Sequence, residues 1–136
     1  MIAVRYFSRG GNTEKLARSI AGALNTEALD VSVPLKEHCD ILFLGSAVYA
    51  GGVDESIKAF LAKNAEKIGL LVNFSTAAVL HSTAAQVRKL AAQHGIAMAD
   101  EEFSCRGSFA FMHRGRPNAA DLSAAAAFAE KFREVE

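Results

Sequence analysis

The chain of 136 residues is 51% hydrophobic and 22% charged, a composition typical of one globular domain and not of an intrinsically disordered chain. Its 15 Lys and Arg residues equal its 15 Asp and Glu residues in number, so charge gives no indication of nucleic acid as a partner. No apolar run is as long as a membrane span, and Cys39 and Cys105 are too few for a disulfide framework or a zinc site, so we expect a cytoplasmic protein.

The chain begins with a predicted strand, a loop with two glycines and a predicted helix. Residues 2–7 form a short apolar run, and residues 14–24 carry apolar side chains at helical spacing. A helix that follows such a loop directs free backbone N–H groups and the positive end of its dipole at an anion. We therefore predict a phosphate-binding loop made of Ser8, Arg9, Gly10, Gly11, Asn12 and Thr13.

The loop lacks the two commonest nucleotide-binding patterns. Gly-x-x-x-x-Gly-Lys-Ser/Thr is absent, which excludes a Walker-type loop, and the Gly-x-Gly-x-x-Gly dinucleotide pattern is absent too. The Ser8 and Thr13 hydroxyls and the Asn12 amide are suited to one terminal monophosphate, with Arg9 as the only cation of the loop. The residues alone also allow an ordinary turn in which Asn12 or Thr13 caps the helix.

Further strand-like and helix-like segments alternate along the chain. Apolar runs predict buried strands at residues 40–45 and 70–75, a more polar strand at 102–109, and an edge strand at 28–33 that ends before Pro34. A capping-box pattern at residues 83–86 and a stop at Gly95 frame one helix, and Pro117-Asn118 precedes the last. The helical residues expected to face the core are Leu16, Ala17, Ile20, Ala21, Leu24, Ile57, Phe60, Leu61, Val87, Leu90, Ala91, Leu122, Ala125, Ala126, Ala129 and Phe132.

This order of elements predicts a single α/β domain over residues 1–136. Five strands and four helices in alternation imply a three-layer sandwich around a parallel sheet. Right-handed crossovers leave few strand orders, of which 2-1-3-4-5 is the commonest. Ligands bind such sheets beyond the carboxyl ends of the strands, where we expect the loops at residues 8–13, 46–52 and 75–82 to meet.

The first of these loops resembles the phosphate loop of the flavodoxin family, which is usually Ser/Thr-x-Thr-Gly-x-Thr. Ser8, Gly11 and Thr13 match that pattern, whereas Gly10 stands where the family commonly has Thr. Later segments around Cys105 and Pro117 are similar to the Cys-x-Gly-x-Phe and Gly-x-Pro-Asn stretches of small flavodoxin-related proteins. The resemblance spans nearly the whole chain and implies the flavodoxin-like fold in its short form.

The second and third loops resemble the two that enclose the flavin ring. Tyr49 fills the place of the family's ring-stacking aromatic, and Gly51 that of a glycine whose carbonyl accepts a hydrogen bond from the protonated flavin N5. Without the resemblance, a lone Tyr such as Tyr49 is more often a half-buried residue that anchors its loop than a residue that stacks on a ligand. The implied ring contacts are Ser46, Ala47, Val48, Tyr49, Ala50 and Gly51, with Ser75, Thr76, Ala77 and Ala78; the family's second aromatic is missing.

The resemblance implies an FMN-binding protein that passes electrons one at a time between partner proteins, with no catalytic residue and no metal of its own. We expect a monomer or weak dimer. One alternative is a small FMN-dependent oxidoreductase of the flavin reductase, quinone reductase or protoporphyrinogen oxidase type, and another is a relative that has lost flavin. A receiver domain is set aside, because Phe7, Ser8, Leu44 and Gly45 occupy positions that would need acidic residues.

Overall fold

The computed structural model describes residues 1–47, 52–77, 82–107 and 113–133. Within them, five strands form one parallel sheet in the order β2-β1-β3-β4-β5, as predicted. The strands are β1 (Ile2–Tyr6), β2 (Ala28–Asp30), β3 (Cys39–Ala47), β4 (Ile68–Ala77) and β5 (Met98–Arg106). The helices are α1 (Asn12–Ala23), α2 (Glu55–Asn64), α3 (Ala84–Gln93) and α4 (Ala119–Arg133), with a short 3-10 helix η1 (Ala65–Lys67). None of these helices is long and apolar enough to cross a membrane.

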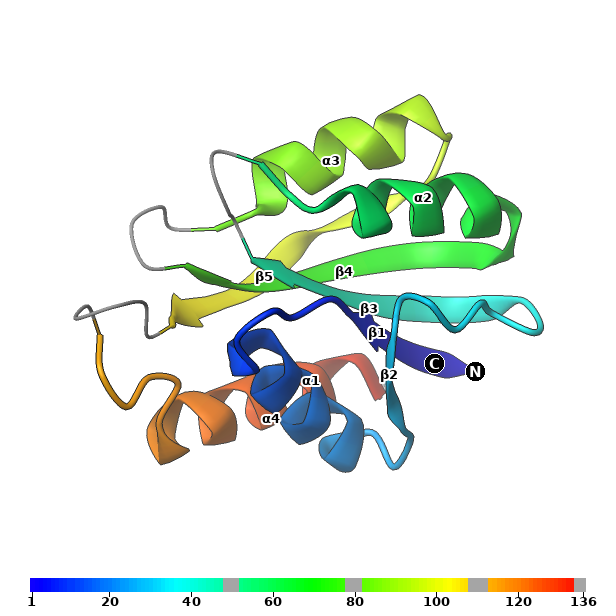
Figure 1. The fold of residues 1–136 in the computed structure, drawn as a ribbon. Helices are drawn as coiled ribbons and strands as arrows, with labels where there is room; N and C mark the ends of the chain where they lie inside the picture. The colour runs from blue at the N-terminus through cyan, green and yellow to red at the C-terminus, as the bar shows by residue number, and fades with distance from the viewer. Residues whose placement is uncertain (48–51, 78–81, 108–112, 134–136) are drawn as a thin grey trace.

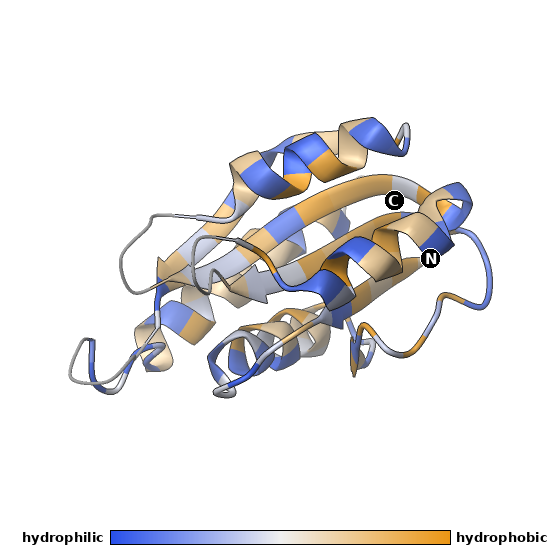
Figure 2. Ribbon diagram, turned by 45° about the horizontal axis from the view of Figure 1, so that its top comes forward, coloured by the Kyte–Doolittle hydropathy of each residue, from blue (hydrophilic) through white to orange (hydrophobic). Residues whose placement is uncertain are grey.

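The helices cover both faces of the sheet and make three layers (Figure 1). α2 and α3 pack on one face, and α1 and α4 pack on the other. Successive residues of a strand point to opposite faces, so Leu42 and Leu44 of β3 join the first core while Ile41 and Phe43 join the second. Burial on both faces explains why the central strands are apolar along most of their length (Figure 2).

The predicted core face of α1 is confirmed, and the helix begins at Asn12, two residues earlier than expected. Gly95 ends the α3 region as predicted: its φ is 68°, and the Ile96 N–H donates to the Ala91 carbonyl at 2.9 Å. The capping box at residues 83–86 is wrong, because the Thr83 side chain caps no helical N–H.

The observed bounds of β2, β3, β4 and β5 differ from the predicted ones. β2 is shorter than residues 28–33, because Asp30 closes a turn in which its carboxylate accepts from the Ser32 N–H at 2.8 Å. It still lies at the edge of the sheet, as predicted. β3 and β4 run two residues further than expected, to Ala47 and Ala77. β5 begins earlier than the predicted residues 102–109.

The start of α4 carries the most elaborate cap among the described helices. Arg116 donates to both carboxylate oxygens of Asp121, Nε to Oδ2 at 2.6 Å and Nη2 to Oδ1 at 2.9 Å. Asn118 and Asp121 also exchange backbone-to-side-chain hydrogen bonds at 2.8 and 2.9 Å. The Arg116 contact is the main reason that the pKa of Asp121 is lowered.

Gly45→Ala should destabilise the fold, because the added Cβ would lie 2.2 and 2.3 Å from Cε2 and Cζ of the buried Phe74 ring. Overpacking of this kind costs about 1–3 kcal/mol of unfolding free energy, measurable by urea denaturation. Gly22→Ala in α1 is the matched control, since its Cβ meets nothing within 4 Å. The control should stabilise by up to about 1 kcal/mol, and equal effects of the two changes would contradict the packing described here.

Asp121→Asn should lower the unfolding free energy at neutral pH. The folded carboxyl has a lowered pKa, so its stabilisation is present above the unfolded pKa and is lost as the pH falls through the folded value. The difference between variant and wild type should therefore shrink below about pH 4 in urea titrations. Asp100→Asn removes an almost fully exposed carboxylate and should change little at any pH. A pH-independent effect of Asp121→Asn would contradict the assignment.

Candidate functional site

The candidate site lies where the order of the sheet reverses, between β1 and β3. The chain leaves β1 into α1 on one face, and after β3 it continues into α2 on the other face (Figure 1). The Phe7 N–H still donates to the Gly45 carbonyl at 3.1 Å, which is the last described backbone bond between the two segments. After it the two segments lead to helices on opposite faces, and open parallel sheets bind ligands at such a point.

Residues 8–13 form a tight turn into α1. The Gly11 N–H donates to the Ser8 Oγ at 3.0 Å, and Gly11 has a φ of 89°, which a residue with a Cβ adopts only with strain. The helix starts at once, with the Lys15 N–H donating to the Gly11 carbonyl at 3.1 Å. The N–H groups of the first turn have no acceptor within the helix and point back toward the loop. A glycine turn followed directly by a helix is an arrangement that favours an anion, and phosphate binding by residues 8–13 stays a prediction.

A buried hydrogen bond joins this turn to the end of β4. Thr13 Oγ1 and Thr76 Oγ1 are 2.9 Å apart, and the two residues are 1% and 3% exposed. Gly107, just after β5, fits against the same point, because a Cβ there would lie 3.1 Å from Asn12 Nδ2 and from Thr76 Cβ. Its N–H donates to the Ala77 carbonyl at 3.3 Å. The start of α1 and the ends of β4 and β5 are therefore packed together.

The cation of the loop is paired with the start of α2. Arg9 Nη2 lies 3.1 Å from Asp54 Oδ1, while Asp54 Oδ2 accepts from the Ser56 N–H at 3.0 Å. The Ser56 bonds are the main cause of the lowered pKa of Asp54, with Arg9 contributing less. Arg9 thus links the two segments that diverge at the site, and its charge is shared with a carboxylate.

A network of buried polar side chains lies beneath this edge of the sheet. Thr83 Oγ1 accepts from Ser46 Oγ at 2.9 Å and from Asn73 Nδ2 at 3.1 Å, and the Thr83 N–H donates to Ser75 Oγ at 3.3 Å. All four residues are at most 1% exposed. The sequence did not predict that Asn73 and Thr83 take part in this network. The one available signal was Asn73, a polar residue inside the apolar run 70–74.

The structure brings the six predicted phosphate-loop residues together at the end of β1. Five of the predicted ring contacts are the last residues of β3 and β4 and are buried there: Ser46, Ala47, Ser75, Thr76 and Ala77. They therefore belong to strands and not to loops. Val48, Tyr49, Ala50, Gly51 and Ala78 lie outside the described residues. The contacts of all these residues with a cofactor stay predictions.

The two cysteines are not activated thiols. Burial raises the pKa of the Cys105 thiol to about 11, and burial also raises that of Cys39. Thiols with raised pKa values carry little of the nucleophilic thiolate near neutral pH. In the part of the chain that the structure describes, no group of three or more His, Cys, Asp or Glu side chains is placed to hold a metal ion.

Comparisons with known proteins agree on the fold. No family model matches the chain. An uncharacterised protein of Methanocaldococcus jannaschii is 29% identical over an alignment of 138 positions, which covers 89% of this chain and 89% of that protein. A flavodoxin from the domain Archaea has a TM-score of 0.77 at 15% identity, covering 98% of this chain and 97% of its own. A flavoprotein of Lactobacillus acidophilus, solved in complex with FMN, has a TM-score of 0.63 at 16% identity and covers 77% of this chain and 91% of its own. Over nearly its full length, therefore, the chain has the flavodoxin-like fold.

Proposed function

We propose that this protein binds FMN and carries electrons one at a time between partner proteins. The observation that supports the proposal most strongly is the turn at residues 8–13, which leads directly into α1 at the reversal point of the sheet. The similarity to flavodoxins and to a flavoprotein crystallised with FMN supports the same cofactor. The cytoplasmic location and the partner proteins stay predictions.

The residues of the turn fit the phosphate of FMN. One of the two hydroxyls, Thr13 Oγ1 or Thr76 Oγ1, donates the hydrogen bond between them. The other hydroxyl keeps its O–H, which can donate a hydrogen bond to a phosphate oxygen. Neither hydroxyl makes another hydrogen bond within the described residues. The α1 dipole and the first-turn N–H groups favour a negative group at the same place.

The phosphate would be held mainly by neutral donors. Arg9 is already paired with Asp54, and its side chain is 60% exposed. An exposed ion pair contributes little free energy, so hydroxyl and backbone N–H groups supply most of the expected affinity. FMN, once bound, supplies the one-electron and two-electron chemistry of its ring, and the chain orients it. We propose that Tyr49 stacks on that ring and that the Gly51 carbonyl meets N5, as the family resemblance implies.

FMN should bind more tightly than riboflavin or FAD. Riboflavin lacks the phosphate, and hydrogen bonds to a charged group contribute about 1.5–3 kcal/mol each, so its affinity should be at least about tenfold lower. FAD carries a bridging pyrophosphate in place of the terminal phosphate that the turn is suited to enclose. Fluorescence titration of the apoprotein with the three flavins measures the order. Equal affinities for FMN and riboflavin would contradict phosphate binding by residues 8–13.

Gly10→Thr should strengthen FMN binding. A Cβ at Gly10 meets nothing within 4 Å, and the position has no left-handed backbone, so the hydroxyl found there in the family can be restored without strain. One added hydrogen bond to phosphate predicts about tenfold tighter binding of FMN and no change for riboflavin. Gly10→Val adds the same bulk without the hydroxyl and is the control. Equal gains for Thr and Val, or none for Thr, would contradict a phosphate at this position.

A further inference from the structure

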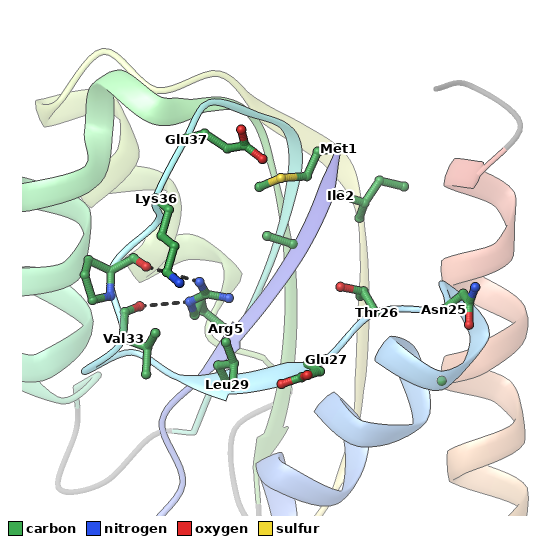
Figure 3. Close-up of a pocket in the computed structure, with 13 residues that line it drawn as sticks. Met1, Ile2, Arg5, Asn25, Thr26, Glu27, Leu29, Val33, Lys36 and Glu37 are labelled. Atoms are coloured by element: carbon green, nitrogen blue, oxygen red, sulfur yellow. Dashed lines mark hydrogen bonds between the residues drawn. The ribbon is translucent and has the colours of Figure 1, made fainter.

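A cleft of about 720 Å³ lies toward the amino end of β1, at the opposite end of that strand from the turn 8–13 (Figure 3). Residues of β1, of β2 and of the loop after β2 line it, together with the end of α1. None of the predicted FMN contacts is among its lining residues. The cleft is therefore separate from the candidate flavin site.

The most unusual feature of this cleft is a buried arginine. Arg5 is 7% exposed and donates to three backbone carbonyls: Nε to Val33 at 2.9 Å, Nη1 to Val4 at 3.1 Å and Nη2 to Pro34 at 3.3 Å. A guanidinium has five N–H donors, so two remain beyond these three bonds. Carbonyls are neutral, so the charge itself is not balanced by them, and burial lowers the pKa of Arg5.

A second cation converges on the first. Lys36, in the loop after β2, is exposed and points toward Arg5 across the cleft (Figure 3). Within the described part of the chain, neither Arg5 nor Lys36 has a carboxylate oxygen within 4.0 Å. Glu27 and Glu37 also line the cleft, yet neither pairs with the two cations among the described residues. The two cations therefore present positive charge to the cleft that an anion can balance.

We propose that this cleft binds a small oxyanion, a phosphate or carboxylate group, between Arg5 and Lys36. The guanidinium keeps two N–H donors beyond its three carbonyl bonds for the oxygens of such a group, and the lysine adds a point charge. The carboxylates of Glu27 and Glu37 oppose a polyanion, so the expected ligand is small. This site does not depend on flavin binding.

Residue-resolved NMR titrations with inorganic phosphate and with acetate, each against chloride at equal ionic strength, test the proposal. A saturable shift of the Arg5, Val33 and Lys36 amides with phosphate or acetate is expected, and its absence with both would overturn the proposal. Shifts of residues 8–13 report phosphate at the candidate flavin site and should disappear after FMN is added, whereas those at Arg5 should persist.

Lys36→Gln should weaken this binding about tenfold, because it removes one charged donor. Lys89→Gln, an equal charge change at an exposed position of α3, should leave the affinity unchanged. Arg5→Lys keeps the charge but removes the planar set of five donors, and should also weaken binding in a protein whose urea unfolding shows that it is folded. Equal affinities of Lys36→Gln and wild type would overturn the proposal.

Discussion

The site depends on the reversal of strand order between β1 and β3. Because α1 and α2 leave these neighbouring strands toward opposite faces, the chain segments after them must separate beyond the Phe7–Gly45 backbone bond. The turn at residues 8–13 and the amino end of α1 lie at this reversal, the place where open parallel sheets bind ligands. Arg9 of this turn and Asp54 before α2 connect the two segments at 3.1 Å. The proposed phosphate-binding turn and the end of β3 are positioned by this one topological feature.

Buried hydroxyls and amides connect the strand ends at this edge of the sheet. The Thr13–Thr76 bond joins α1 to β4, and Thr83 joins the start of α3 to both β3 and β4 through Ser46 and Asn73. Buried polar groups are costly unless they are hydrogen-bonded, so such a network favours one arrangement of the strand ends. A flavin site needs this order, because its contacts come from segments that are distant in the sequence.

The strands and helices could be predicted well because their signals are local or periodic. Continuous apolar runs identified β3 and β4, and the stripe that includes Leu16 and Ile20 identified the buried face of α1. The ends of β3 and β4 could not be predicted, because Ser46 and Ala47 suit a strand or a loop equally well. They are strand residues because they pair with Ser75 and Thr76 of the neighbouring strand.

The errors at the site have the same long-range origin. The pattern at residues 83–86 predicts a capping box, but the Thr83 hydroxyl bonds to Ser46 and Asn73 instead. No local pattern shows such partners. The turn at residues 8–13 was predictable because its shape depends on neighbours in sequence, namely a strand, two glycines and a helix. Arg5 gave no signal either, since a single charge in a short strand is usually exposed.

Stepwise reduction of the FMN-loaded protein, followed by absorbance and electron paramagnetic resonance, tests the proposed function most directly. A one-electron carrier separates the two reduction steps, so we predict a flavin radical signal that is largest near half reduction. A protein that takes up no FMN would contradict flavin binding. A protein that passes from oxidised to fully reduced flavin without a radical would contradict one-electron transfer and favour a two-electron FMN oxidoreductase.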